Sequence, residues 1–185
     1  MPLGAGRFGL LGGVADLGKL ELIQTINASA SSAVAFDDVF GTYNVHFLTF
    51  NNLTKSAGGS YYTSMKFSAD GGSSYTGNYP QALQMAEGTS FYEIKTTNYG
   101  SVRIGQHGDS EPSNGYCYIY NFTDSSKYTF TTQHSSNQPN GGNGGMVFGS
   151  HAHTTAQANN YLEIKSYAST ANLSGTFSLY GIAES

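Results

Sequence analysis

The chain has no tryptophan, one cysteine, four prolines and few charged residues. Charged side chains make up 11% of its 185 residues, whereas ordinary soluble domains contain roughly 25%. This low content excludes a charge-rich disordered chain and a coiled coil. The single Cys117 cannot form an internal disulfide, which excludes a disulfide-stapled scaffold, and we expect a free buried thiol.

Basic clusters and long apolar runs are also absent. The net charge is -4, and without neighbouring Lys or Arg residues the chain lacks the means to neutralise phosphates, which argues against nucleic acid as a partner. Arg7, Asp16 and Lys19 interrupt the first twenty residues, so no secretory signal is predicted. No run approaches the roughly 20 apolar residues that span a bilayer. We therefore expect synthesis in the cytoplasm and no membrane insertion.

Glycine, by contrast, is abundant, and it is concentrated at the start of the chain. Residues 1–19 combine glycines with scattered apolar side chains and show neither helical nor alternating periodicity. Such a segment loses much entropy when it is ordered, yet it is too apolar for a solvated linker. It is either a floppy terminus or an arm that docks on a neighbouring protein. In the second case the anchoring residues are Leu3, Arg7, Phe8, Leu10, Leu11 and Val14.

Residues 20–185 have the composition of short β-strands. Ten segments are rich in Tyr, Phe, Thr, Val and Ile: 20–26, 32–36, 43–50, 60–68, 91–97, 115–122, 127–134, 145–152, 160–168 and 174–182. They start roughly every 10 to 17 residues, a spacing typical of an antiparallel sandwich or barrel. Only residues 80–87 have a sequence that could hold a helical turn. We predict an all-β domain over 20–185, preceded by the Gly-rich arm.

Alternation and turn residues add local detail. Tyr61, Thr63, Met65 and Phe67 share one face of their segment and are expected in the core. The segment 174–182 has apolar residues on both faces, which is typical of a central strand or a subunit contact. The Asp-Gly-Gly sequence at 70–72 predicts a tight hairpin, and the glycines of 140–145 predict a long loop.

Motifs of common enzymes and metal sites are missing, including Gly-x-Ser-x-Gly, the phosphate loop, HExxH and paired cysteines. The strongest metal candidate is the pair His151 and His153, which share one face of a strand. Two ligands are insufficient, and the spacing of His46, His107 and His134 does not place a third beside them. We expect exposed or hydrogen-bonded histidines that could titrate near neutral pH, with no metal and no cofactor.

The acidic residues do not form a recognisable catalytic pair. A glycosidase needs two carboxylates across a sugar-binding cleft. The candidates Asp37, Asp38, Asp70, Asp109, Glu111 and Asp124 fall at turns or in loops, where Asp commonly supports the backbone. No calcium loop of the DxDxDG type occurs. The sequence therefore favours a noncatalytic protein. A small glycan hydrolase that uses Asp37 or Asp109 is the least favoured function.

Tyrosines form the most distinctive pattern. Tyr116, Tyr118 and Tyr120 share one face of a predicted strand, opposite Cys117 and Ile119. Each side chain has an apolar ring and a polar tip. Three roles are open for this stripe: the edge of the core, a surface on which saccharides stack, or a subunit interface.

Several segments together resemble a family of virion proteins. The opening run LELIQTINASASSAVAFDDVFGTYNVHFLTFNNL, the turn MKFSADGGSSY and the ending SGTFSLYGI are similar to β-rich surface and fibre domains of tailed bacteriophages. The matching features are Phe36, Tyr43, the turn over 68–75 and the terminal motif over 174–181. The middle of the chain, residues 80–160, does not contribute to the resemblance.

The resemblance implies a jelly-roll-like β-sandwich on the surface of a particle, frequent trimerisation and no reaction. It does not distinguish a tail fibre from a capsid decoration protein. We therefore expect a noncatalytic virion protein that is attached through residues 1–19 to other virion proteins and forms a homotrimer. As a fibre it would meet a host surface glycan or protein through loops such as 105–115 and 135–145, and as a capsid decoration protein it would clamp neighbouring shell subunits with its base. The alternative is a free carbohydrate-binding module that uses the tyrosine stripe.

Overall fold

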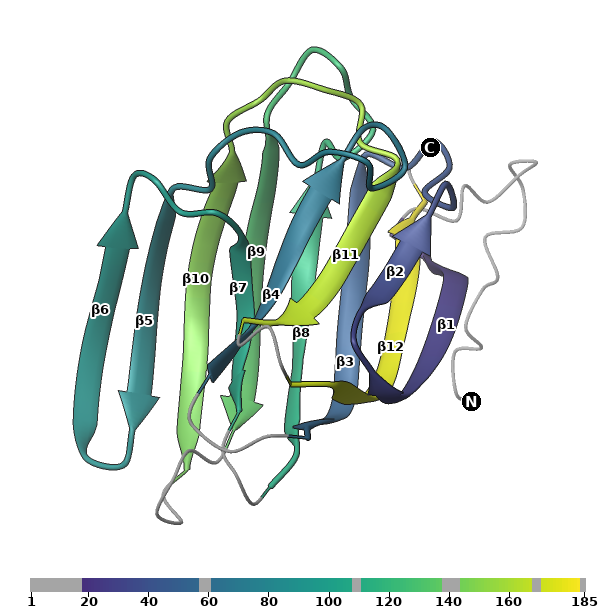
Figure 1. Ribbon diagram of the computed structural model, residues 1–185. Coiled ribbons are helices and arrows are strands. Elements are labelled where there is room, and N and C mark those ends of the chain that lie inside the picture. The colour runs from purple at the N-terminus through teal and green to yellow at the C-terminus, as the bar shows by residue number, and fades with distance from the viewer. Residues whose placement is uncertain (1–17, 57–60, 108–110, 138–143, 168–170, 184–185) are drawn as a thin grey trace, which may run out of the picture.

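The computed structural model describes residues 18–56, 61–107, 111–137, 144–167 and 171–183, in which there are twelve β-strands and no helix (Figure 1). The strands are β1 (Leu20–Ser31), β2 (Val34–Asp37), β3 (Val45–Lys55), β4 (Tyr61–Ser68), β5 (Gln81–Glu87), β6 (Ser90–Thr96), β7 (Val102–His107), β8 (Ser113–Tyr120), β9 (Thr129–Asn137), β10 (Gly145–His153), β11 (Tyr161–Ser166) and β12 (Leu173–Ile182). All paired strands are antiparallel, and they form a sandwich of an eight-stranded and a four-stranded sheet. The predicted all-β sandwich is confirmed.

The order of the strands is that of a jelly roll with two insertions. The large sheet has the order β1-β12-β3-β8-β9-β10-β5-β6, and the small sheet has the order β2-β11-β4-β7. Pairs β1 with β12, β2 with β11, β3 with β8 and β4 with β7 correspond to one long antiparallel hairpin wound into two layers. The remaining strands β5, β6, β9 and β10 are inserted between β4 and β7 and between β8 and β11. They extend the large sheet beyond β8.

The main core lies between the two sheets and is built by inward residues of the jelly-roll strands, to which β1 contributes partly buried ones. Phe36, Phe50, Phe67 and Phe177 are fully buried, as are many aliphatic residues around them. The predicted inward positions Thr63, Met65 and Phe67 are 0% exposed, while the side chain of Tyr61 lies outside the described part. Cys117 is buried as expected, and burial raises the pKa of its thiol.

A layer of polar side chains is buried under the extension of the large sheet. The inward positions of β9 are Thr129, Thr131, Gln133, Ser135 and Asn137, all at most 8% exposed. β7, at the edge of the small sheet, lies against this strand. The inserted strands also have a small apolar cluster of their own, made of Leu83, Met85 and Val147, on which Tyr62 packs. The extension is therefore more polar inside than the jelly roll proper.

Three local expectations differ from the structure. Residues 81–87 form the strand β5 and not a helical turn, because Gln81, Leu83 and Met85 point to the buried side at a spacing of two. The Asp70 turn has glycines with positive φ, as predicted, but β4 and β5 belong to different sheets, so the turn does not close a hairpin. The segment Val102–His107 is a strand that the composition did not indicate.

Of the two roles expected for the segment 174–182, a central strand or a subunit contact, the central strand is confirmed. β12 lies between β1 and β3, and its Phe177 and Leu179 are fully buried. The described chain begins and ends together, since Gly18 N–H donates to Ala183 O at 2.9 Å. At the opposite end of the sandwich, the last residue of β9 is paired with the first of β10, and Asn114 at the start of β8 is paired with Ser136 (Figure 1). One end of the molecule therefore holds the first and last described residues, and the other holds the paired ends of β8, β9 and β10.

Candidate functional site

The outer face of the eight-stranded sheet, the face turned away from the core, carries most of the exposed aromatic residues. The pairing places Tyr180, Phe47 and Tyr118 side by side on β12, β3 and β8. A neighbouring row continues from Tyr116 through His134 to Phe148 on β8, β9 and β10. A third row joins Val45, Tyr120, Phe130 and Ala152. We call these three rows the aromatic face.

The rings of the aromatic face are in contact with one another. The Phe47 ring centroid is 4.7 Å from that of Tyr118, 5.6 Å from Tyr116 and 6.2 Å from Tyr180. Tyr116 meets His134 at 5.8 Å, edge to face, in a geometry that aromatic pairs prefer. These contacts reach across β12, β3, β8 and β9, so the rings form one continuous surface.

The face is uncharged over five neighbouring strands. In the described parts of β12, β3, β8, β9 and β10, Lys55 at the end of β3 is the one Asp, Glu, Lys or Arg. Exposure is nevertheless substantial, at 38% for Tyr116, 45% for Phe130 and 39% for Phe148. Contiguous apolar patches beyond a few hundred Å² are rare on monomeric proteins and mark binding surfaces. Of the three roles open for Tyr116, Tyr118 and Tyr120, the core role is excluded by this position.

Shallow hollows lie on the same side of the sheet. One of about 730 Å³ is lined by residues that include Ala82, Lys95, Phe130 and Ala152. Another of about 350 Å³ lies beside Phe47, Tyr116 and His134. Both are open depressions between rows of side chains, and they would accept protruding side chains or sugar rings.

His151 and His153, the strongest metal candidates of the sequence, are buried structural residues. His151 is 3% exposed, and its Nε2 accepts a hydrogen bond from the backbone N–H of Arg103 at 3.1 Å. His153 is 1% exposed, lies 2.6 Å from Thr76 O through Nε2, and stacks on Tyr79. Among the residues that the structure describes, no group of three His, Cys, Asp or Glu could hold a metal ion. A titrating surface patch is also not formed by this pair, because both rings are inside.

Burial decides the protonation of these rings. Desolvation lowers the pKa of His151 to about 3, and the positive charge of Arg103 adds to the effect. Burial also lowers the pKa of His46 and His153, against hydrogen bonds to Phe40 O and Thr76 O that favour the charged form. All three rings are therefore neutral in the folded protein near pH 7.

The acidic residues that a hydrolase would need support turns. Asp70 accepts hydrogen bonds from the Ser68 hydroxyl at 2.5 Å, from the Ser74 hydroxyl at 2.6 Å and from Ser74 N–H at 2.9 Å, and these contacts lower its pKa to about 2. Asp37 ends β2 opposite Tyr161, and Asp38 has a positive φ of 50°. Asp109 lies outside the described residues. A general acid needs a raised pKa, so Asp70 is unsuited to that role.

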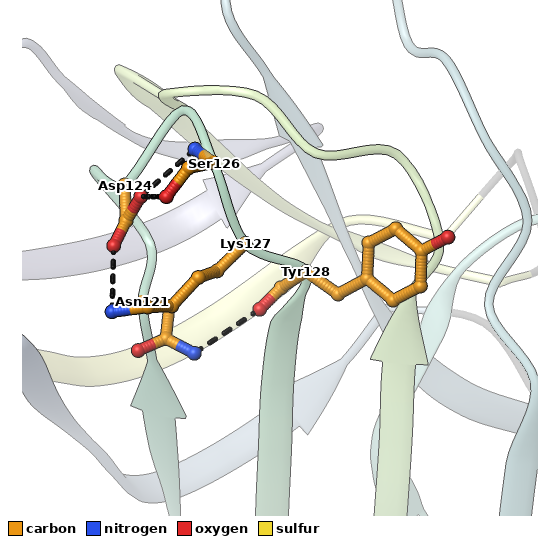
Figure 2. Close-up of polar contacts among 5 residues, drawn as sticks. All are labelled: Asn121, Asp124, Ser126, Lys127 and Tyr128. Carbon is orange, nitrogen blue, oxygen red and sulfur yellow. Dashed lines mark hydrogen bonds and ion pairs between the residues drawn. The ribbon is translucent and has the colours of Figure 1, made fainter.

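Figure 2 shows the equivalent arrangement in the β8–β9 turn. Asp124 accepts hydrogen bonds from Ser126 N–H at 2.8 Å and from its hydroxyl at 2.6 Å, and pairs with Lys127 at 2.9 Å. These contacts lower the pKa of Asp124 to about 2. Asn121, with a positive φ of 57°, donates from its amide to Tyr128 O. The carboxylate closes the turn and faces no second carboxylate in this group of residues.

Only some of the site residues predicted from the sequence can be placed in the structure. The tyrosine stripe is part of the site, but Phe47, Phe148 and Tyr180 were missed because only strand pairing brings them beside it. The anchoring residues Leu3, Arg7, Phe8, Leu10, Leu11 and Val14 lie outside the described residues. Within the described ranges, no helix is long and apolar enough to cross a membrane.

Fold and surface together define a jelly-roll sandwich with one uncharged aromatic face. No family model matches the chain, and no curated protein or solved structure matches it either.

Proposed function

We propose that this chain is a noncatalytic structural protein of a tailed-bacteriophage virion, either a surface fibre or a capsid decoration component. In this role it is made in the host cytoplasm, joins other virion proteins through residues 1–19 and forms a homotrimer. The observation that carries the proposal is the aromatic face, which spans five strands without a charge among its outward residues. A sheet surface of this kind is suited to burial against another subunit.

The size of the aromatic face fits such a contact. Five strands about 4.8 Å apart and three outward rows about 6.8 Å apart cover about 490 Å² before side-chain relief is counted. A stable interface buries about 800 Å² on each partner, so one subunit contact would use the whole face and some of the surface around it. Tyr and Phe are enriched in interface cores while Lys, Glu and Asp are depleted, which matches the composition of β12, β3, β8, β9 and β10.

The position of the first described residue supports attachment of the domain by one end of the sandwich. Gly18, where the described chain begins, is hydrogen-bonded to Ala183 at one end. The strands that flank loops 105–115 and 135–145 approach each other at the opposite end, where Ser113 Oγ donates to Ser136 O at 3.2 Å. An arm that anchors the domain by residues 1–19 would point these loops away from the particle, where a host glycan or protein could be met.

Deletion of residues 2–19 tests the attachment. The truncated chain should keep its cooperative unfolding transition, because β1 starts at Leu20 and the core lies beyond it. It should be missing from purified particles when it is supplied in place of the full chain. Normal incorporation of the truncated chain would contradict attachment through the arm. Copy number then separates the two locations, since hundreds per particle indicate capsid decoration and a few to a few tens indicate a tail.

A free carbohydrate-binding module is the second candidate. The observation in its favour is that the hollow beside Tyr116 and His134 opens between aromatic rings on which sugars could stack. This function predicts a monomer that binds neutral oligosaccharides through the aromatic face. A trimeric mass in solution together with no response on a glycan array would eliminate it.

A further inference from the structure

The outer face of the four-stranded sheet differs sharply from the aromatic face. Register pairs Lys66 of β4 with Glu163 of β11, and Ser64 with Lys165. Arg103 of β7 lies beside Ser64 on the next strand. Three of the eight Lys and Arg residues of the chain are therefore placed on adjacent strands of a protein whose net charge is -4.

A polar pocket of about 600 Å³ lies over these residues, lined by Lys66, Glu163 and Lys165 and bordered by tyrosine rings. Tyr75 comes from the segment between β4 and β5, Tyr99 from the segment between β6 and β7, and Tyr167 follows β11. The volume falls in the range of small-ligand sites. The pocket is separate from the aromatic face, because it is on the opposite side of the sandwich.

The pocket is built around one nearly buried carboxylate. Glu163 is 9% exposed, and Lys165 Nζ lies 2.7 Å from its Oε2. Burial raises the pKa of Tyr75, and the neighbouring Glu163 carboxylate adds to the effect. Glu163 thus pairs with Lys165 and lies beside Tyr75 in the lining of the pocket.

The remaining positive charge is available to a ligand. Lys66 Nζ lies 5.5 Å from the ring centroid of Tyr75, while the one ion pair found among the described pocket residues joins Lys165 to Glu163. The pocket lining thus holds two ammonium groups, of Lys66 and Lys165, and one carboxylate, of Glu163, which leaves one positive charge in excess. Arg103 does not line the pocket, but its guanidinium is 4.1 Å from the Tyr62 ring centroid and 4.3 Å from that of Tyr99. It therefore contacts one of the bordering tyrosines and adds a further positive charge nearby.

We infer that this pocket binds an acidic saccharide, with the sugar carboxylate at Lys66 and the sugar hydroxyls at Glu163 and Ser64. Tyrosine rings provide flat apolar surfaces for the faces of the sugar ring, and carboxylate and hydroxyl side chains match its hydroxyl groups. A peptide would find few apolar subsites, because the lining is mainly Ser, Lys, Glu and Tyr. The surplus of positive charge selects an acidic sugar over a neutral one.

The test uses the full chain and three probes, galacturonic acid, galactose and inorganic phosphate, followed by amide chemical shifts in a titration. Galacturonic acid should shift the amides of residues 64–66 and 163–165 and bind about fivefold more tightly than galactose, as expected for one partly exposed ion pair. Lys66→Gln should remove that advantage, and Lys66→Arg should retain most of it. Lys127→Gln, which removes a lysine from the β8–β9 turn of Figure 2, should leave the affinity unchanged.

Three results would overturn the inference. One is equal binding of galacturonic acid by the protein and by Lys66→Gln, provided that the variant has the same melting temperature. Another is phosphate binding as tight as that of the sugar acid, which would make the pocket a simple anion site. The third is that galacturonic acid shifts only the amides of the aromatic face, which would favour a carbohydrate-binding module that uses that face.

The biological setting of this inference rests on the proposed function, since a host-surface glycan is what a virion-surface pocket would meet. The two can fail separately. If the pocket is wrong, Lys66→Gln particles should contain the chain and attach to cells normally. If the virion role is wrong, the chain should be absent from particles while the purified protein still binds galacturonic acid through Lys66.

Discussion

At the scale of single residues, three buried neutral histidines link stability to pH. The pKa of His151 is about 3 in the folded protein, and that of an unfolded histidine is about 6.5. Between these values the unfolded chain binds a proton that the folded chain does not, so the free energy of unfolding falls as the pH falls. The slope approaches about 1.4 kcal/mol per pH unit for such a residue.

We therefore predict a marked loss of stability between pH 6.5 and pH 4.5, measured by urea unfolding. Asp70 and Asp124, whose pKa values are lowered to about 2, act in the same direction only below about pH 4. His151→Gln should reduce the slope when each variant is compared with its own stability at pH 7.5. Equal unfolding free energies at pH 7.5 and pH 4.5 would show that these rings do not titrate as described.

At the scale of strands, the inserted pair β5–β6 depends on a close approach of β10. Gly149 is paired with Leu83 and has a φ of +153°. A Cβ at this position would collide with the backbone oxygen of Ala82 and lie 2.8 Å from Leu83 Cα. Backbone atoms in a paired strand cannot move aside easily, so the site requires glycine.

Gly149→Ala should consequently lower the free energy of unfolding by at least about 2 kcal/mol. Amide hydrogen exchange should locate the effect in β5 and β6, whose protection would fall before that of β3 and β12. Gly144→Ala is the matched control, because a Cβ at Gly144 meets no atom within 4 Å. Comparable losses in both variants would mean that the contact with β5 is not the cause.

Strand composition was predictable from the sequence where side chains alternate, as in β4 and β9, because the pleat exposes every second residue. Residues 81–87 were ambiguous, since Ala, Leu, Gln, Met and Glu are good helix formers and pairing with β10 overrides that preference. β7 was missed because Arg103, Gly105 and Gln106 dilute its apolar pattern. In both segments the strand forms because it pairs with a strand that is distant in sequence, and local propensity carries no information on that pairing.

At the scale of the whole molecule, the binding surfaces could be predicted only in part. The tyrosines of β8 pointed to one surface, but its width comes from strands that are far apart in sequence, such as Phe47 and Tyr180. The polar pocket was not indicated at all, because Lys66 and Glu163 are 97 positions apart and meet only through register. Surfaces made by non-local pairing leave no local signal.

If the aromatic face holds the subunits together, charge placed on it should separate them. Tyr116→Lys should convert a trimer to a monomer in sedimentation equilibrium, because an unpaired ammonium would be buried in the contact. Tyr167→Lys is the control on the opposite sheet, where Tyr167 is 54% exposed, and it should leave the mass unchanged. A trimer that persists in Tyr116→Lys would assign the association to another surface.

A reconstruction of the purified phage particle tests the central claim most directly. We predict density for the jelly roll in which a neighbouring subunit covers Phe47, Tyr118 and Phe148 and the end with Gly18 and Ala183 faces the particle. Particles without the chain, or a domain whose aromatic face is open to solvent, would contradict the account.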